Sequence, residues 1–249
     1  MKKPPPAQPA YILHARPYRD SSLILELLTS NFGRIGCVAR GARRDKQRRQ
    51  QALQPFSPLL VSLLGNSTLK TLGSVENATA PLWLKGRAVY AGLYANELLV
   101  RLLPEGEAHY TLFAMYQMLL KALAQLKGDD SNPLEGPLRR FELQLLAELG
   151  NCPPLDYCAG SRGTVSESAC YRLEIEQGFV PVHRQGGNVL RDGEFSGAEL
   201  LGIVQALESG QWPAGLLPPA KRLTRILLRA MLGDKPLRSR TLFRQVYGK

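Results

Sequence analysis

The chain has 249 residues, of which 44% are apolar and 21% charged, and its formal net charge is +11. This composition is typical of a globular protein and excludes a disordered or fibrous chain. No segment approaches the roughly 18 consecutive apolar residues of a membrane helix, so we expect no membrane partner. Residues 1–10 begin with two lysines and then prolines, without an apolar stretch. They predict a flexible arm rather than a signal peptide, and therefore a cytoplasmic protein.

The positive charge is concentrated at the two ends of the chain. Residues 1–49 hold eleven Lys and Arg against three Asp and Glu, and residues 221–249 hold nine against one. The middle, residues 50–220, holds twelve against seventeen. Two basic ends around a mildly acidic middle are typical of a protein that binds a polyanion through two surfaces. Nucleic acid is therefore the first partner to expect.

Four cysteines are too few for a disulfide scaffold in a chain of this length, and we expect reduced thiols. They are Cys37, Cys152, Cys158 and Cys170. The last three include no Cys-x2-Cys pair, and three ligands do not complete a structural zinc site unless His183 is the fourth. We expect neither a bound metal nor a cofactor.

Five short strands are predicted near the N-terminus, separated by turn signals at nearly even spacing. They cover residues 11–16, 22–28, 34–40, 58–64 and 68–75. Five strands within about seventy residues predict a small closed barrel. Chain length alone leaves an SH3-like barrel open as an alternative.

From residue 81 the apolar period changes from two to nearly four, which predicts helices. These cover residues 89–100, 112–126, 138–149, 196–208, 218–232 and 239–247, with Pro133 to Pro137 separating the second from the third. Ser196 and Glu199 have the spacing of a capping box. Residues 151–195 are rich in Gly, Pro and Cys, with strand-like pieces at 171–175 and 179–183. We predict a barrel (1–80), a helical domain (81–150), an irregular insert (151–195) and C-terminal helices (196–249) that pack on the helical domain.

Signatures of an enzyme are missing from the sequence. There is no phosphate-binding loop, no His-Glu-x-x-His, no Gly-x-Ser-x-Gly and no Gly-x-Gly-x-x-Gly. His14, His109 and His183 lie far apart, and the adjacent pair Asp129 and Asp130 lies in a turn-forming stretch. We expect no catalytic residue.

The segment from Arg40 to Arg49 holds six cations in ten residues and no apolar residue larger than Ala. Such a segment cannot pack into a core, so it predicts an exposed loop. Its candidate DNA-binding residues are Arg40, Arg43, Arg44, Lys46, Arg48 and Arg49. Arg predominates, and its forked guanidinium suits phosphate. The alternative is a solubilising loop without a partner, which we consider weaker because so concentrated a charge repels itself.

Two further groups of residues are candidates for DNA binding. Tyr18 and Phe32 lie in predicted turns beside cations and are candidates for base stacking, although each is as well suited to plug an end of the barrel. The predicted helix at 218–232 repeats cations at helical spacing, which favours a second anion-binding surface. These cations are Lys221, Arg222, Arg225 and Arg229, and further cations follow at Lys235, Arg238, Arg240 and Arg244. The anion can be a phosphate backbone or an acidic peptide.

Several short segments, in this order and spacing, resemble the RecO family of bacterial recombination mediators. They are Leu13–Tyr18, Gly33–Arg34, Ala39–Arg43, Gln54–Leu59, Leu93–Leu99, Leu138–Glu142, Cys158–Ser161, Ala220–Arg225 and Lys235–Arg244. The resemblance implies an OB-fold barrel, a helical domain and a zinc-knuckle region. Because this sequence keeps only part of the cysteine pattern of the family, we expect a degenerate knuckle without metal.

The resemblance also implies functions and site residues. Members of the family bind single- and double-stranded DNA and anneal complementary strands. With RecR they help to load RecA on strands coated by single-strand-binding protein (SSB), whose acidic tail they recognise. By matching position, Arg34, Arg40 and Arg43 would contact DNA, and Arg139 beside Phe141 would form part of the pocket for the SSB tail. The alternative is that Phe141 is a core residue and Arg139 a surface cation.

We therefore expect an α+β, non-enzymatic DNA repair mediator associated with the nucleoid. Two other classes stay open at this point. One is a general RNA-binding or ribosome-associated OB-fold protein, and the other is a metal-dependent nuclease or transferase.

Overall fold

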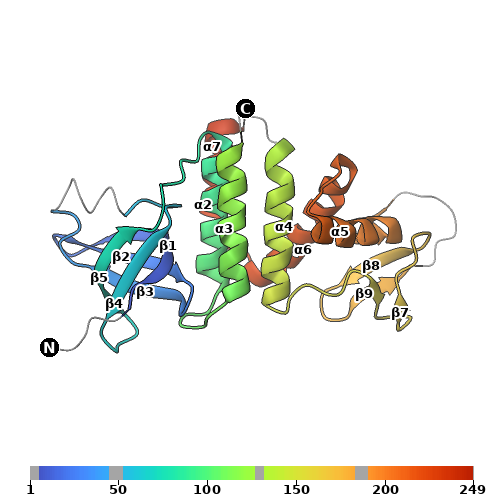
Figure 1. The fold of residues 1–249 in the computed structure, drawn as a ribbon. Coiled ribbons are helices and arrows are strands. Elements are labelled where there is room, and N and C mark those ends of the chain that lie inside the picture. Colours follow the sequence, from blue (N-terminus) through green and yellow to red (C-terminus); the bar gives the residue numbers. More distant parts are fainter. Residues whose placement is uncertain (1–5, 45–52, 127–131, 183–189, 249) are drawn as a thin grey trace. The chain divides into compact units, whose positions relative to one another are not determined.

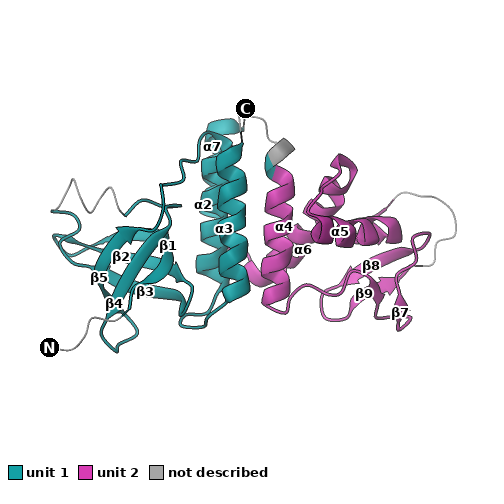
Figure 2. Cartoon of the chain, in the orientation of Figure 1, with its two compact units in different colours: residues 1–134, 236–249 teal, residues 135–235 magenta. Residues whose placement is uncertain are grey.

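The computed structural model describes residues 6–44, 53–126, 132–182 and 190–248, and its fold is α+β as predicted (Figure 1). The chain divides into two compact units (Figure 2). Unit 1 comprises residues 1–134 and 236–249, and unit 2 comprises residues 135–235. The end of the chain therefore returns to the unit that contains the barrel.

Unit 1 contains a closed barrel of five strands. These are β1 (Gln8–Tyr18), β2 (Ser22–Thr29), β3 (Gly33–Ala39), β4 (Leu59–Leu64) and β5 (Lys70–Asn77). Their hydrogen-bonded order is β1-β2-β3-β5-β4, with β4 returning to β1. The β3–β5 pair is parallel, and the other pairs of described strands in the barrel are antiparallel. This closed order is OB-like and confirms the predicted barrel.

The interior of the barrel follows from the alternation of side chains along each strand. Leu25 and Leu27 of β2, Ile35 and Cys37 of β3, and Val61 of β4 are buried in one apolar cluster. Residues two apart on a strand lie on the same face. Full burial of one such Leu side chain stabilises the fold by roughly 1.5–3 kcal/mol. Burial also raises the pKa of Cys37 to about 12, with a further contribution from nearby Glu26, so this thiol stays neutral.

The turn between β2 and β3 lies against the segment that joins two helices, α2 (Arg87–Leu102) and α3 (Tyr110–Gln125). Gly33 has a φ of +60°, and a Cβ there would lie 1.6 Å from the carbonyl oxygen of Glu107. Glycine is therefore required at this turn, both for its backbone conformation and for the close approach. Helix α3 also packs on β1 through aromatic contacts. The ring of Tyr11 on β1 lies 5.6 Å from that of Phe113 and 5.2 Å from that of Tyr116, both on α3.

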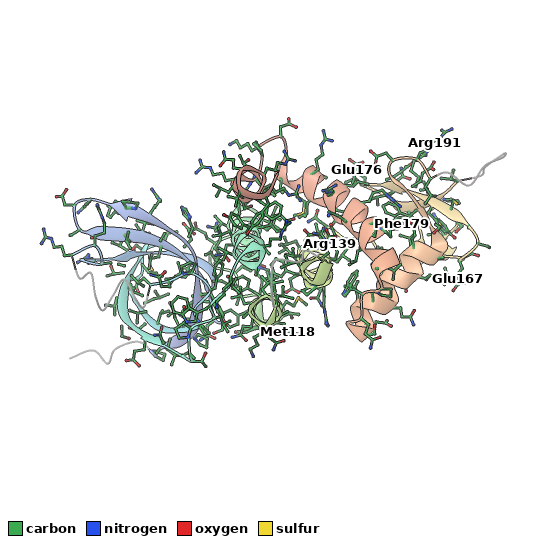
Figure 3. The ribbon with its side chains drawn as sticks, turned by 90° about the horizontal axis from the view of Figure 1, so that it is seen from above. Met118, Arg139, Glu167, Glu176, Phe179 and Arg191 are labelled. Atoms are coloured by element: carbon green, nitrogen blue, oxygen red, sulfur yellow. The ribbon has the colours of Figure 1, made fainter. Side chains whose placement is uncertain are left out.

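Unit 2 combines helices with a small five-stranded sheet. Its elements are α4 (Asn132–Glu148, which begins in unit 1), β6 (Tyr157–Cys158), β7 (Gly163–Thr164), β8 (Cys170–Glu174), β9 (Gly178–Pro181), β10 (Glu194–Ser196), α5 (Gly197–Ser209), the 3-10 turn η1 (Ala214–Leu216) and α6 (Leu217–Leu232). The sheet order is β10-β8-β9-β6-β7. Phe179, which Figure 3 labels, and Phe195 are fully buried in it. Their rings lie 5.9 Å apart and edge to face.

The predicted capping box of α5 is present. Ser196 Oγ accepts from the backbone N–H of Glu199, and the Glu199 carboxylate accepts from the backbone N–H of Ser196. The two bonds satisfy N–H groups that lack an intrahelical partner at the start of a helix.

Two sequence predictions about chain organisation are wrong. The arm predicted over residues 1–10 extends too far, because β1 begins at Gln8 and Ala10 is fully buried. Pro137 does not separate two helices, because it lies inside α4, which begins at Asn132. Pro137 is the sixth residue of α4, beyond the first turn, so the helix continues there without one backbone hydrogen bond instead of ending.

The predicted domain limits differ from the compact units. Helices α2 and α3 belong to the same unit as the barrel, whereas most of α4 belongs to unit 2. The C-terminal helices also divide, because α5 and α6 lie in unit 2, and the last helix, α7 (Arg238–Tyr247), packs on α2 in unit 1. Periodicity predicts each helix but carries no information on which neighbour covers its apolar face.

Candidate nucleic-acid interface

The turn between β1 and β2 carries an aromatic ring and a cation in contact. Arg19 has a φ of +50°, and its guanidinium carbon lies 5.1 Å from the ring centroid of half-buried Tyr18. A residue other than glycine with positive φ is uncommon and is found at turns and functional sites. Here this conformation presents an exposed arginine at one end of the barrel.

The start of the predicted basic loop packs on this turn. The backbone N–H of Arg43 donates to the carbonyl of Ser21 across 2.9 Å. The Arg43 guanidinium donates to the carbonyls of Arg19 and Asp20 at 3.2 and 3.4 Å. Ala42, the residue before Arg43, is fully buried in the barrel core. The loop therefore begins at a fixed place beside the turn.

Strand register brings two further cations to the same end. Leu23 of β2 pairs with Pro17 of β1 on one side and with Ala39 of β3 on the other. Arg16 precedes this row by one residue and Arg40 follows it by one, so they lie about 10 Å apart across the strands and about 7 Å apart along them. Both side chains are exposed.

We call this group of residues the basic end of the barrel. It consists of Arg16, Tyr18, Arg19, Arg40, Arg43 and Arg44. Arg16 and Arg19 are not among the residues predicted from the sequence, although both flank the Pro-Tyr pair that precedes the turn. Lys46, Arg48 and Arg49 of the predicted loop lie outside the described residues.

Arg34 is not part of the basic end, and its contacts favour a structural role over the predicted contact with DNA. Its guanidinium forms ion pairs with Glu26 at 2.8 Å and Glu105 at 3.2 Å, and its Nε donates to the carbonyl of Leu103 at 2.9 Å. Only 14% of its side chain is exposed. Because its charge is compensated and its donors are engaged, Arg34 joins the barrel to the segment between α2 and α3.

Phe32 does not lie beside Tyr18. It is 49% exposed in the turn between β2 and β3, whereas Tyr18 precedes the turn between β1 and β2. The eight residues of β2 separate the two turns by about 25 Å. The two rings therefore cannot form one stacking platform.

The four cations predicted on α6 fall into two groups. Lys221 forms an ion pair with Glu135, and Arg222 pairs with Glu199 at 3.2 Å and lies 4.6 Å from the ring centroid of Phe195. These contacts hold unit 2 together. Arg225 and Arg229 are exposed. Of the four cations predicted to form one continuous face of this helix, two are exposed and two are paired with carboxylates.

The predicted pocket at Arg139 and Phe141 is also not present as expected. Phe141 is 2% exposed and Arg139 is 6% exposed. Figure 3 labels Arg139 on α4. Arg139 pairs with fully buried Glu142 at 2.5 Å and donates to Thr224 Oγ1 of α6 at 2.9 Å. Phe141 is a core residue, and Arg139 is a buried structural cation rather than a surface one, so neither is available to a peptide.

The cysteine-containing insert does not fit a zinc ion. Cys158 is fully buried in β6, Cys170 lies in β8, and burial raises the pKa of Cys152 to about 11. Within the described residues, no three His, Cys, Asp or Glu side chains are grouped so that they could hold a metal. His183 lies outside those residues.

The fold and this interface define an α+β protein built on an OB-like barrel with a cationic end. Comparison with known protein families identifies the family. The model described as "Recombination protein O N terminal" matches residues 6–80, and the one described as "Recombination protein O C terminal" matches residues 84–241. The chain therefore belongs to the RecO family.

Individual relatives agree with this family. The chain is 42% identical to the DNA repair protein RecO of Proteus mirabilis over 239 residues, which cover 96% of this chain and 92% of the relative. It is 44% identical to the DNA repair protein RecO of Yersinia pestis and to that of Yersinia pseudotuberculosis, each over 96% of this chain and 94% of the relative. These similarities support a role in DNA repair. Among the helices of the described residues, none has the length and apolar character needed to span a membrane.

Proposed function

We propose that the chain is a non-enzymatic recombination mediator that binds single- and double-stranded DNA and anneals complementary strands. With RecR, it would help to load RecA on single strands coated by SSB. The observation that carries the proposal is the basic end of the barrel, where five exposed arginines and Tyr18 gather around one turn. Membership of a family whose members are named DNA repair proteins supports it.

Annealing at such a surface needs no nucleotide hydrolysis. Two strands that are held on cationic surfaces lose much of their mutual phosphate repulsion, so their encounters lead to base pairing more often. Arginine forks bind phosphate oxygens, and a ring such as Tyr18 stacks on an unpaired base whatever its identity. Each phosphate contact on a single strand should contribute about 0.7 to the salt slope of binding.

Two triple variants with equal charge change test the role of the barrel. Each replaces three exposed arginines by Gln: Arg16, Arg19 and Arg44 at the basic end, or Arg162, Arg172 and Arg191 in unit 2. We expect only the first to slow annealing of bare oligonucleotides and to lower the salt slope by about 2, at about 0.7 per contact. Equal losses in both would contradict the proposal. A preference of the native chain for structured RNA over single-stranded DNA would favour the RNA-binding alternative.

The mediator role needs strands that are already coated. Annealing of complementary oligonucleotides covered by intact SSB should be fast, and annealing on SSB that lacks its acidic tail should be slow. If bare strands anneal and coated strands do not with either form, the chain is a DNA-binding protein without mediator activity of its own. Because Arg139 and Phe141 are buried, we assign no residue to recognition of the tail.

A further inference from the structure

The last helix, α7, is strongly cationic. It carries Arg238, Arg240 and Arg244 and no acidic residue, and all three arginines are exposed. On α6, which carries the other cations of the predicted second anion-binding surface, two of the four cations are neutralised by carboxylates. Unit 1 therefore contains two separate groups of exposed arginines, one on the barrel and one on α7.

The start of α7 is held by a carboxylate from another helix. Glu97 on α2 accepts from the backbone N–H groups of Arg238 and Ser239, both at 2.8 Å, and from the Ser239 hydroxyl at 2.6 Å. Leu237 at the N-cap position offers no side-chain acceptor of its own. Glu97 thus satisfies N–H groups that have no partner within the helix.

The other end of α7 is held by aromatic contacts. The ring of Tyr90 lies 5.9 Å from that of Phe243 and 5.6 Å from that of Tyr247, in edge-to-face arrangements. The Arg87 guanidinium lies 4.5 Å from the centroid of Tyr247. Because Arg87 begins α2 and Glu97 lies near its end, α7 runs antiparallel to α2 (Figure 1). Its arginines are therefore displayed from a fixed helix rather than from a loose tail.

The charge on α7 lacks compensation within the described part of the chain. Glu97, the carboxylate that contacts α7, accepts from backbone N–H groups and a hydroxyl and not from an arginine side chain of that helix. Arg240 donates to the Tyr94 hydroxyl at 3.2 Å, which is neutral. The guanidinium groups of Arg238 and Arg244 form no ion pair with any described residue. Three like charges so close together repel one another unless a polyanion neutralises them.

We propose that α7 is a second binding surface for a nucleic-acid backbone and receives one strand while the basic end of the barrel holds the other. This inference rests on the proposed function and names the second site that annealing requires. Arg240 and Arg244 are one helical turn apart, about 6 Å along the axis.

An acidic protein segment with apolar side chains is the competing occupant of α7. Leu242 and Val246 are 46% and 54% exposed, and they could contact such side chains. At 100° per residue, however, Leu242 lies about 160° around the helix from Arg240 and Arg244, and Val246 lies about 120° from Arg240 and about 160° from Arg244. Arg238, about 40° from Leu242, is the one arginine of α7 on that apolar flank. The flank with two arginines at one-turn spacing fits phosphates better.

Two double variants with the same charge change and spacing test the proposal. One replaces Arg240 and Arg244 of α7 by Gln, and the matched control replaces Arg225 and Arg229 of α6, which are also exposed and four residues apart. We measure binding of a first labelled oligonucleotide, binding of a second to the saturated protein, and annealing. The α7 variant should keep the first strand, lose the second and anneal slowly. Its salt slope for the second strand should fall by about 1.4, at about 0.7 per phosphate.

Other outcomes separate the two proposals. If the native chain binds no DNA, the proposed function fails and this inference fails with it. If the native chain holds two strands and the α7 variant does so equally, or if the α6 control loses as much, only this inference is overturned. The α7 variant can also anneal bare strands normally but lose binding of an acidic peptide. That result would assign α7 to a protein partner and overturn this inference as well. Because Arg240 packs on Tyr94, the single change Arg244→Gln, expected to lower the slope by about 0.7, separates lost charge from altered packing.

Discussion

Tyr116 on α3 donates its hydroxyl to the Oδ1 atom of Asn96 on α2 across 2.5 Å. Asn96 donates its Nδ2 to the carbonyl of Leu13 in β1 across 3.0 Å. The register of β1 on β2 shifts between Ile12 and His14, so Leu13 lies at a bulge. A bulge leaves a residue outside the strand ladder. The two helices thus satisfy a backbone group that the neighbouring strand does not reach, and this fixes the barrel to them.

The first prediction concerns this buried network. Tyr116→Phe keeps the ring but leaves Asn96 Oδ1 without its donor at a site where both residues are almost fully buried. We expect the free energy of unfolding to fall by about 1–3 kcal/mol, the cost of one unsatisfied buried polar group. Urea unfolding measures it, with Tyr110→Phe on the 66% exposed surface of α3 as control. Equal stability of the two variants would show that the hydrogen bond contributes nothing.

Much of the fold could be predicted because its signals are local. Alternating apolar residues and turn-forming pairs predict the ends of each barrel strand to within three residues, and the predicted spacing of Ser196 and Glu199 proves to be a capping box. The units could not be predicted in the same way. Phe243 and Tyr247 of α7 pack on Tyr90, and no local pattern indicates a neighbour so distant in the sequence.

The same distinction explains the candidate site. The basic loop is evident from composition, but a cation is available to DNA only if no distant carboxylate pairs with it. Glu105 lies 71 positions from Arg34, and Glu135 lies 86 positions from Lys221. Arg139 meets Thr224 across 85 positions. Residues that look equivalent in the sequence therefore divide into structural and exposed cations only after folding.

The second prediction concerns pH and the attachment of α7. Partial burial raises the pKa of Glu97, but the hydrogen bonds from Ser239 and Arg238 and the charge of Arg101 outweigh it, so the pKa is lowered from its ordinary value of 4.5. A lowered pKa in the folded state stabilises the protein above the ordinary value, and this stabilisation is lost as the pH falls from there through the folded pKa. We expect proteolysis within residues 236–248 to increase in that acidic range.

The variant Glu97→Gln separates this effect from general acid unfolding. It should release α7 at neutral pH already and show a smaller further change on acidification, because it has no carboxylate to protonate at this position. Glu76→Gln, at an exposed position on β5, is the matched control and should behave like the native chain. A native pH profile in Glu97→Gln would show that the aromatic contacts alone hold the helix.

The third prediction distinguishes a structural arginine from one that binds DNA. Arg34→Met removes two ion pairs and a bond to the Leu103 carbonyl, so we expect the free energy of unfolding to fall by about 1.5–3 kcal/mol. The salt slope of DNA binding should not change. Arg44→Met, at an exposed position, should do the reverse, with unchanged stability and a slope lowered by about 0.7. A lowered slope in Arg34→Met would return this residue to the interface.

The fourth prediction concerns the two aromatic side chains in the barrel turns. Tyr18 contacts Arg19 at the basic end, whereas Phe32 lies at the other end of β2 beside no described member of that group. Tyr18→Ala should therefore weaken binding of single strands by about 1–3 kcal/mol, the usual contribution of one stacked base. Tyr18→Phe keeps the ring and should bind as the native chain does, and Phe32→Ala should have no effect. Fluorescence titration with a short oligonucleotide measures all three. If Phe32→Ala weakens binding as much as Tyr18→Ala, the strand extends along the whole of β2, because only that path reaches both rings.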